Sequence, residues 1–336
     1  MFQPERVFFE KDALSYSLGK ELYSYFQKKG VEVRFTTSHN RVTGIPGKSV
    51  REKFFRAKRT LVVGLRKSKE FATCRPSAHY QLPLATGCPG SCEYCYLHTN
   101  LGRNPYIRIY VNQDEILEKA EKYISERLPE TTVFEGAATA DPLSVEAYSG
   151  ALAKAITFFA DQENARFRFV TKFTDVDPLL ALEHRNKTRF RFSINTPQAI
   201  AEYERATPRL EARLQAAEKV AAAGYPLGLM IAPIFAEGDW KQDYTALLEK
   251  LQPFAKHADL TFELITHRFT ARAKKVILEL FPETKLPMVE ESRTFKWGQF
   301  GYGKYVYPKE MKAEVEAFFR KEMARRFPLA KIDYFV

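Results

Sequence analysis

Three cysteines within eight residues are the feature of this sequence best suited to chemistry. Cys88, Cys92 and Cys95 stand in the stretch GCPGSCEYCY (87–96), with the spacing Cys-x3-Cys-x2-Cys. Thiolates placed so closely can converge on one metal centre, and soft sulfur ligands select zinc, copper(I) or iron–sulfur clusters. Iron–sulfur clusters are usually held by four cysteines, so three would leave a [4Fe-4S] cluster with one iron open to a substrate or cofactor. The loop therefore favours a catalytic centre.

Two structural interpretations of this loop stay open at this point. A zinc site could be completed by His98 or His79, and a closed electron-transfer cluster could take Cys74 as its fourth ligand. Zinc knuckles favour paired Cys-x2-Cys modules, and bacterial ferredoxins carry Cys-x2-Cys-x2-Cys-x3-Cys. Neither spacing matches the loop.

Composition indicates a globular protein with a basic balance. The chain has 336 residues, of which 45% are hydrophobic and 28% charged, and its formal net charge is +11. No apolar run approaches the roughly 20 residues that span a bilayer, and the N-terminus lacks the order of a signal peptide. With only four cysteines, a secreted disulfide framework is not expected, so we predict a reducing cytoplasm and no membrane partner. The net charge raises the odds of a polyanionic partner.

The cysteine loop must be positioned by a regular run of strands and helices. Residues 1–80 are expected to form an α/β extension with strands near 6–9, 31–35 and 61–65, a helix over 14–29 and a basic, turn-rich segment over 36–58. From 81 to 282, six apolar runs alternate with amphipathic stretches. The expected strands are 82–86, 132–135, 167–172, 190–195, 227–233 and 260–265, and the expected helices begin near Asn112 and cover 144–160, 208–223, 242–255 and 270–281.

This alternation predicts parallel strands joined by right-handed crossovers. Six repeats suit a partial (β/α)6 barrel, in which chemistry gathers at the carboxyl ends of the strands. The cysteine loop follows the first expected strand, where that rule places a cofactor. Asn112, with Glu115 three residues later, is expected to cap the first helix as in a capping box.

The third expected part, 283–336, contains a hairpin, a helix over 309–326 and a closing strand over 332–336. Aromatic and basic side chains flank glycines in the hairpin, a composition suited to stacking and to phosphate contacts. We therefore expect this hairpin to contact nucleic acid, unless it is an ordinary packed hairpin. Its candidate contact residues are Lys296, Trp297, Tyr302, Lys304 and Tyr305.

A Cys-x3-Cys-x2-Cys loop after the first strand of a six-repeat barrel resembles the radical S-adenosylmethionine superfamily. The resemblance implies that the three thiolates hold a [4Fe-4S] cluster whose open iron is chelated by S-adenosylmethionine. Longer blocks resemble the spore photoproduct lyase family: PSA (76–78), LATGC (84–88), CYL (95–97), FVTKF (169–173), RFRFSIN (189–195), AGYPLG (223–228), FELI (262–265) and HRFT (267–270).

This resemblance implies a DNA repair enzyme acting on 5-thyminyl-5,6-dihydrothymine in double-stranded DNA. A 5′-deoxyadenosyl radical would take a hydrogen atom from C6 of the dihydrothymine ring, and the methylene bridge would then break. The lesion is expected to leave the duplex, since stacking hides its atoms. A cellular electron donor, a monomeric state and location in the spore core are expected with it.

Residue roles follow from position within the resembling blocks. For the cofactor, Lys172 would pair with the carboxylate of S-adenosylmethionine, Ser193 and Asn195 would face the same space, and Tyr96 would lie against the adenine. Tyr94 and Tyr96 would relay a hydrogen atom when the cofactor is regenerated. For the lesion, Asp141 would accept hydrogen bonds from a thymine edge, and His267 and Arg268 would either contact it or be structural.

Two departures from the family pattern concern thiols. The family's hydrogen-atom donor, a cysteine after the second strand, aligns with Ala138 in FEGAATAD (134–141), and Cys74 stands where serine is expected. Alanine has no weak bond to hydrogen to give, so we expect impaired completion of repair, with Cys74 as a substitute donor. We interpret the pair as engineered, with natural divergence as the alternative.

Two other functions remain open from the sequence. One is a radical S-adenosylmethionine enzyme that modifies RNA or protein. The other is a non-catalytic, zinc-stabilised module that binds nucleic acid, which requires four closed ligands.

Overall fold

The computed structural model describes every residue except 1, 69, 137, 299–300 and 302. Contacts between Cα atoms divide the chain into two compact units. The first comprises Met1–Gly90 and Asn100–Phe190, and the second comprises Ser91–Thr99 and Arg191–Val336. The cysteine loop thus leaves the first unit after Gly90. The division at 80 and 282 expected from the sequence stays a prediction.

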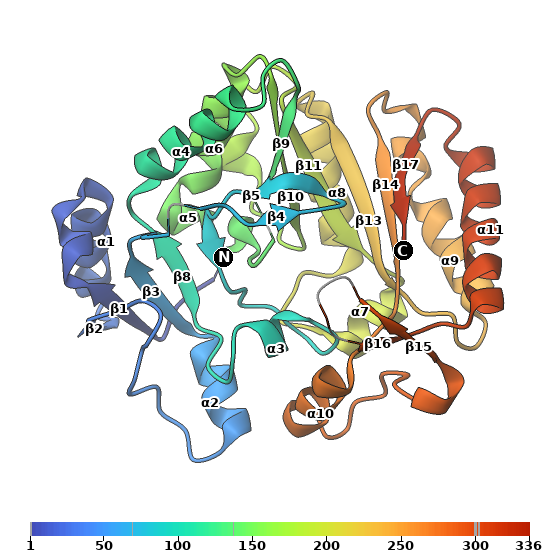
Figure 1. Ribbon diagram of the computed structural model, residues 1–336, viewed down its shortest axis with the longest axis horizontal. Coiled ribbons are helices and arrows are strands. Elements are labelled where there is room, and N and C mark those ends of the chain that lie inside the picture. Colours follow the sequence, from blue (N-terminus) through green and yellow to red (C-terminus); the bar gives the residue numbers. More distant parts are fainter. Residues whose placement is uncertain (1, 69, 137, 299–300, 302) are drawn as a thin grey trace. The chain divides into compact units, whose positions relative to one another are not determined.

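A five-stranded sheet forms one layer of the first unit (Figure 1). Four of its strands are parallel, and β6 is antiparallel to β8. Its order is β2 (Glu32–Thr36), β1 (Arg6–Glu10), β3 (Thr60–Gly64), β8 (Ile107–Tyr110) and β6 (Ala85–Thr86). Side chains alternate across β1, so Val7 and Phe9 pack with Phe26 of α1 (Ser17–Lys28), whereas Phe8 packs with Ala57 of α2 (Val50–Ala57). Helices therefore cover both faces of the sheet.

The remaining strands of the first unit belong to the curved sheet predicted from the sequence. In it, β9 (Thr132–Glu135) pairs in parallel with β10 (Ala165–Thr171) and with β5 (Ala78–Gln81), and β5 pairs antiparallel with β4 (Thr73–Cys74). The prediction of a first barrel strand at 82–86 is wrong: β5 takes that place, and Ala85–Thr86 joins the other sheet. An apolar run predicts a strand, but it does not show which other strand will pair with it.

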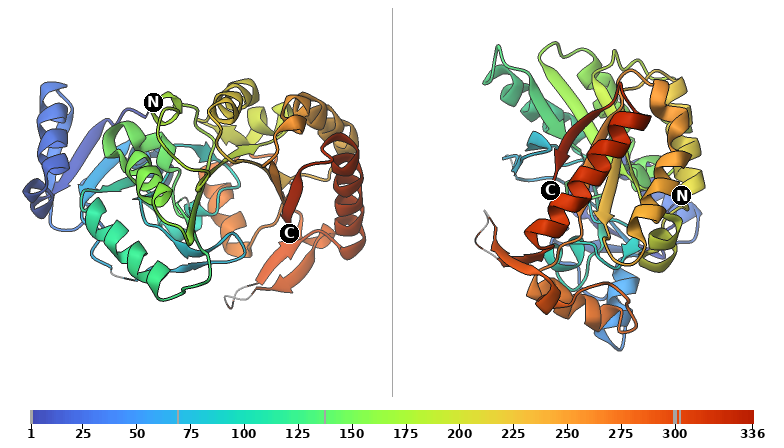
Figure 2. Two further views of the ribbon diagram at one scale, coloured as in Figure 1. Left: turned by 90° about the horizontal axis from the view of Figure 1, so that it is seen from above. Right: turned by 90° about the vertical axis from the view of Figure 1, so that its right-hand side faces the viewer.

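Strand β11 (Thr188–Ile194) begins in the first unit and ends in the second. Within the second unit, β14 (Thr261–Thr266) pairs in parallel with β13 (Leu227–Ile234) and with β17 (Lys331–Phe335). Helices α9 (Trp240–Lys250) and α11 (Lys309–Arg326) lie side by side against these strands (Figures 1 and 2). Tyr244 of α9 meets Phe319 of α11 at 5.3 Å between ring centres.

The second unit contains eight further α-helices and strands among its described residues. They are β7 (Ser91–Cys92), α3 (Leu97–Asn100), α7 (Pro197–Tyr203), β12 (Glu204–Arg205), α8 (Leu210–Ala222), α10 (Ala271–Leu280), β15 (Thr294–Trp297) and β16 (Gly303–Val306). The predicted hairpin is confirmed as the antiparallel pair β15–β16, and the predicted helix over 309–326 is α11.

Two local predictions in the first unit differ from the structure. The helix expected over 144–160 is broken at Gly150, whose φ of 59° separates α5 (Glu146–Ser149) from α6 (Ala151–Ala160). The prediction of a capping box at the start of α4 (Gln113–Ser125) is wrong, because the Asn112 side chain does not cap the helix. Asn112 instead accepts a hydrogen bond from the backbone N–H of Arg66 and donates one to the Glu115 carboxylate.

Helix α2 was not predicted, because its segment was interpreted as turn-rich. Its start is nevertheless a sequence signal: the Ser49 hydroxyl accepts from the backbone N–H of Glu52 at 3.1 Å. Phe54 and Ala57 are its buried residues, and its other side chains include Arg51, Lys53 and Arg56 together with Glu52 and Phe55. No helix in the described part of the chain is long and apolar enough to cross a membrane.

Candidate functional site

The cysteine loop begins at a glycine that no other residue could replace without strain. Gly87 has φ +87°, and a Cβ there would lie 2.8 Å from the carbonyl oxygen of Tyr106. Its N–H donates to the carbonyl of Thr139 at 2.8 Å, and Gly87 forms a parallel bridge with Ala140. Cys88 therefore starts beside the segment that follows β9 and that carries Ala138 and Asp141.

A buried lysine, not predicted from the sequence, holds the first half of the loop. Lys58 directly follows α2 and is 3% exposed. Its Nζ donates to the carbonyl oxygens of Cys88 at 2.9 Å and Gly90 at 2.5 Å. A buried ammonium is costly unless it is paired, so these carbonyls and any negative charge on the loop compensate it. The stretch 36–58 contains many Lys and Arg residues, and nothing in its sequence indicates that Lys58 would be buried.

In the second unit, the loop continues as part of a two-stranded ribbon. β7 pairs antiparallel with β12, with Cys92 opposite Glu204. The N–H of Glu93 donates to the carbonyl of Tyr203, and the N–H of Cys95 donates to the carbonyl of Cys92 at 3.1 Å. Cys92 is buried and Cys95 is half-buried, as is Cys88 in the first unit. All four cysteines are thiols rather than half-cystines.

A buried polar chain fixes Tyr94. Its hydroxyl donates to Oε1 of Glu204, and Glu204 Oε2 accepts from Nη2 of Arg213 at 2.5 Å. Arg213, also buried, donates from Nη1 to the carbonyl of Ser193 at 2.9 Å. Burial, with the Glu204 carboxylate second, raises the pKa of Tyr94 well above its ordinary value. Tyr94 is thus anchored, whereas Tyr96 is 54% exposed and accessible.

The two histidines considered as zinc ligands have other partners. A ring nitrogen of His98, Nε2, lies 2.6 Å from the carbonyl of Cys92, and Nδ1 of His79 accepts from the N–H of Val133 at 2.9 Å. Among the described residues, no three His, Cys, Asp or Glu side chains are already arranged to hold a metal ion. The ligand set Cys88, Cys92 and Cys95 stays a prediction from spacing.

Asp141 joins the ends of two barrel strands in the first unit. Its carboxylate accepts from the Thr171 hydroxyl at 2.7 Å and from the backbone N–H of Lys172 at 2.8 Å. Burial raises its pKa to about 6, although the hydrogen bonds from Lys172 and Thr171 act in the opposite direction. A contact between Asp141 and a thymine stays a prediction. What the structure shows is that Asp141 positions Lys172, whose side chain is half-buried.

Ala138 lines a pocket of the first unit together with Gly136, Thr139, Gln81 and Thr86, among others. Cys74 lies on the neighbouring β4–β5 hairpin, paired with Ala78. This hairpin is tied to the end of β9, three residues before Ala138, by the Ser77 hydroxyl, which donates to Glu135 at 2.7 Å. The two positions that depart from the family pattern therefore belong to adjoining segments.

Asn195, predicted to bind the cofactor, is fully buried and its amide is engaged within the second unit. Nδ2 donates to the carbonyl of Pro233 at 2.8 Å, and Oδ1 accepts from the hydroxyl of Tyr244 at 3.1 Å and from the N–H of Thr196 at 2.9 Å. These bonds indicate that Asn195 orders the end of β11. Ser193, 5% exposed, lies two residues earlier on the same strand.

His267 has a structural environment, while its neighbour Arg268 is exposed. The ring lies 5.0 Å from that of Phe235 and 5.9 Å from that of Phe269. Burial, and secondly the charge of Arg293, lowers the pKa of His267 to about 3, so the ring is neutral at physiological pH. This favours the structural alternative for His267.

The β15–β16 hairpin presents the basic and aromatic residues predicted to contact nucleic acid. Lys296 lies directly opposite Lys304, and Phe295 lies opposite Tyr305. Trp297 is 70% exposed. Burial, followed by the charges of Arg268, Lys296 and Lys312, lowers the pKa of Lys304. Tyr302 lies outside the described residues.

Tyr305 anchors this hairpin to the segment that follows β14. Its ring stacks on Phe269, 5.2 Å away, and the backbones of Phe269 and Tyr305 exchange hydrogen bonds of 3.1 and 2.7 Å. A direct contact of Tyr305 with nucleic acid stays a prediction. The exposed candidates are Lys296 and Trp297.

Comparison with known proteins matches the whole chain to one family. The family model described as spore photoproduct lyase matches residues 2–336. The chain belongs to the spore photoproduct lyase family. It is 50% identical to the spore photoproduct lyase of Clostridium acetobutylicum, over 98% of both chains, and 48% identical to that of Bacillus subtilis, over 99% of this chain and 98% of the relative.

Solved spore photoproduct lyases confirm the predicted fold class, a partial barrel of the radical S-adenosylmethionine type. One, complexed with dinucleoside spore photoproduct, is 48% identical with a TM-score of 0.97, covering 100% of this chain and 99% of that chain. Another, a variant with one cysteine replaced by alanine and one serine by cysteine, contains bound AdoMet and dinucleoside spore photoproduct. It is 49% identical, with the same TM-score and the same coverage of both chains.

That variant carries the same two kinds of replacement that we infer at Ala138 and Cys74. This chain nevertheless differs from each of these relatives and structures at about half of its positions, so it is not an engineered form of any of them. The interpretation that the pair is engineered stays a prediction.

Proposed function

We propose that this chain is a DNA repair lyase that returns the spore photoproduct 5-thyminyl-5,6-dihydrothymine to two thymines. The observation that carries the proposal is the family match over residues 2–336, joined to a fold shared with a lyase solved with AdoMet and the dinucleoside lesion. The three-cysteine loop, begun at Gly87 beside the segment of Ala138 and Asp141, supplies the chemistry.

The loop fits a [4Fe-4S] cluster and S-adenosylmethionine. Cys88, Cys92 and Cys95 would hold the cluster, and their free thiols and the buried ammonium of Lys58 suit an anionic iron–sulfur centre. When bound, the pair supplies a 5′-deoxyadenosyl radical able to take a hydrogen atom from C6 of the dihydrothymine. The protein's own task is to orient both partners and to return a hydrogen atom.

Orientation of S-adenosylmethionine falls to side chains at strand ends. Lys172 would pair its ammonium with the carboxylate of the cofactor, and Asp141 would hold the backbone of Lys172 in place through the bond to its N–H. Tyr96, exposed after the third cysteine, would lie against the adenine. Ser193 would face the cofactor from β11, and Asn195 would contribute by ordering the end of that strand through its bonds to Pro233 and Tyr244.

Return of the hydrogen atom is assigned to Cys74. The methyl group of Ala138 cannot donate, whereas the S–H bond of a thiol is weak enough to give its hydrogen to a thymine radical. Cys74 is half-buried, on a hairpin tied to β9 by Ser77 and Glu135. Of the two tyrosines, Tyr96 is the better relay, because the Tyr94 hydroxyl hydrogen is donated to Glu204.

The partner is double-stranded DNA bearing the lesion, bound through the β15–β16 hairpin. Like charges directly opposite on a two-stranded ribbon are unfavourable, and DNA phosphates bound by Lys296 and by Lys304 would relieve the repulsion. Trp297 would stack on a base exposed when the lesion leaves the duplex. A monomer in the spore cytoplasm, served by a cellular electron donor, completes the proposal.

An anaerobic assay tests the proposal. The reconstituted chain, S-adenosylmethionine and dithionite are incubated with dinucleoside spore photoproduct, and thymidine release is followed by chromatography. Release of thymidine supports the lyase; its absence, together with modification of RNA supplied in parallel, would favour the RNA-modifying alternative. The same preparation is analysed for iron, sulfide and zinc. Iron with sulfide would exclude the zinc-stabilised module, and zinc without them would support it.

Comparison of Cys74→Ser, Ala138→Cys and the double variant tests the donor. We expect Cys74→Ser to lower the yield of intact thymine and to raise side products, and Ala138→Cys to restore the yield in that background. Equal yields with and without Cys74 would show that the hydrogen comes from elsewhere.

A further inference from the structure

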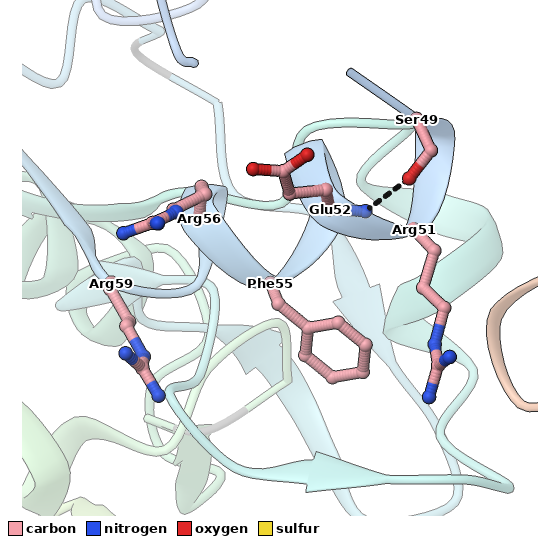
Figure 3. A pocket seen from close by; sticks show the side chains of 6 residues that line it. All are labelled: Ser49, Arg51, Glu52, Phe55, Arg56 and Arg59. Atoms are coloured by element: carbon pink, nitrogen blue, oxygen red, sulfur yellow. Dashed lines mark hydrogen bonds between the residues drawn. The ribbon is translucent and has the colours of Figure 1, made fainter. Parts of the chain in front are cut away.

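A second basic surface lies on α2, in the first unit. Its residues, which we call the α2 surface, are Ser49, Arg51, Glu52, Phe55, Arg56 and Arg59, and they line a shallow pocket (Figure 3). Phe55 lies between Arg51 and Arg59 in Figure 3, and the guanidinium carbon of Arg51 is 5.9 Å from the centre of its ring. None of the functions assigned above uses this surface.

The α2 surface is attached to the cysteine loop by a single residue. Arg59 lines the surface, and the preceding Lys58 donates hydrogen bonds to the carbonyls of Cys88 and Gly90. On its other side α2 is anchored by buried Ala57, which packs with Phe8 of β1. Anything bound at the α2 surface is therefore held close to the first cysteine by a short hydrogen-bonded path.

Charges of both signs alternate over the α2 surface. Arg56 and Arg59 each donate to the carboxylate of Glu5, at 2.9 and 2.8 Å. Glu52 accepts from the backbone N–H of Lys48 at 2.8 Å and is exposed, as is Arg51. An aromatic ring framed by arginines, with both charges around it, is typical of a protein–protein interface. Electrostatic pairing there fixes orientation and speeds encounter.

Duplex DNA is a poorer occupant. It presents only negative charge, about one unit every 1.7 Å, and offers nothing to pair with exposed Glu52, whereas a protein face can place a carboxylate opposite Arg51 and a cation opposite Glu52. The net excess of cations favours a protein whose contact face is acidic. Redox encounters also need only a small interface, commonly below about 1,200 Å².

We propose that the α2 surface docks an acidic one-electron carrier, a low-potential flavin or iron–sulfur protein, which reduces the cofactor of the cysteine loop. The inference rests on the proposed function. The carrier loses one electron, the cluster held by the three cysteines gains it, and no atom is transferred. Phe55 is the apolar centre of the contact, Arg51 pairs with a carboxylate of the carrier, and Arg59, held by Glu5, adds positive charge beside it.

The test compares two charge reversals in the full-length, reconstituted protein. Arg51→Glu/Arg59→Glu changes the α2 surface, and Lys20→Glu/Lys28→Glu, on exposed positions of α1, makes the same change of net charge elsewhere. A bacterial flavodoxin and a [4Fe-4S] ferredoxin serve as probes in calorimetry, with short duplex DNA as a third ligand. Reduction of the cluster by each reduced carrier is followed by stopped-flow absorbance.

We expect the α2 reversal to weaken binding of at least one carrier ~10-fold and to slow its reduction of the cluster similarly. The α1 reversal should change both by less than about twofold, and dithionite-driven repair should be unchanged in both variants. Loss of repair with dithionite in the unmodified chain would instead contradict the proposed function. The docking proposal is overturned if neither carrier binds, if both reversals act equally, or if the α2 reversal weakens only DNA.

Discussion

The α2 surface and the β15–β16 hairpin have similar compositions but differ in how their charges are paired. On α2, Arg56 and Arg59 share Glu5, and Glu52 lies among the arginines. On the hairpin, Lys296 faces Lys304, and the charge of Arg268 adds to theirs. Cations with their own carboxylates suit a protein partner, which brings both signs of charge. Cations that face one another suit a polyanion, so pairing rather than composition separates the two surfaces.

Reversal of the opposed lysines is expected to have the largest effect. Lys296→Glu/Lys304→Glu should weaken binding of lesion-bearing duplex DNA ~100-fold and reduce the slope of log affinity against log salt by about 2, because two phosphate contacts are lost. Fluorescence anisotropy at several salt concentrations measures both. The double reversal Arg51→Glu/Arg59→Glu is the matched control. Equal weakening by both pairs would erase the distinction between the surfaces.

Lys58 links α2 to the cysteine loop, and its replacement should destabilise the folded protein. Lys58→Met keeps the length of the side chain but removes two hydrogen bonds to the loop. We expect a loss of about 1–3 kcal/mol in the free energy of unfolding, measured by denaturant titration, and less iron bound per chain. Lys53→Met, at an exposed position of the same helix, should change neither. An unaffected Lys58→Met protein would mean that the loop holds its shape without α2.

The two exposed aromatic residues should act on different partners. Trp297→Ala should weaken DNA binding by about 1–2 kcal/mol through lost stacking, with little change in binding of the carrier. Phe55→Ala should have the reverse pattern. Parallel titration of both variants with DNA and with flavodoxin provides the measurement, and a shared pattern would indicate a single continuous binding surface.

The smallest effect is a pH dependence of DNA binding. The pKa of Lys304 is lowered in the free protein by burial and by neighbouring cations, and DNA phosphates favour its charged form. Affinity should therefore be greatest below that lowered pKa and fall about two- to threefold as the pH rises through it, below 10.5. Lys304→Arg keeps its charge and should flatten the profile. A profile unchanged by this substitution would assign the titration to another group.

Local signals in the sequence predicted much of this structure. The strand Thr132–Glu135 and the helix Lys309–Arg326 have the predicted bounds, because the residue types that favour a strand or a helix are local features of the sequence. The spacing of the cysteines similarly pointed to the site. The first barrel strand was misplaced, since the pairing of β5 with β9 depends on residues far away in the chain.

Burial of polar side chains was the least predictable property. Lys58 stands among exposed cations in the sequence, yet it is buried and donates to the carbonyls of Cys88 and Gly90. The amide of Asn195 looked available for the cofactor but is used by Pro233 and Tyr244. Such roles are set by which backbone carbonyls lie nearby in the fold, and no residue type or spacing carries that information.

The opposed lysines of the hairpin give dissolved salt two contrary actions on one element. Added ions screen the repulsion between Lys296 and Lys304. The pairing of β15 with β16 in the free protein therefore becomes more stable as ionic strength rises. The same ions compete with the protein for the phosphates and weaken the complex. Conditions chosen to keep the purified protein well ordered are therefore the ones in which it holds DNA least firmly.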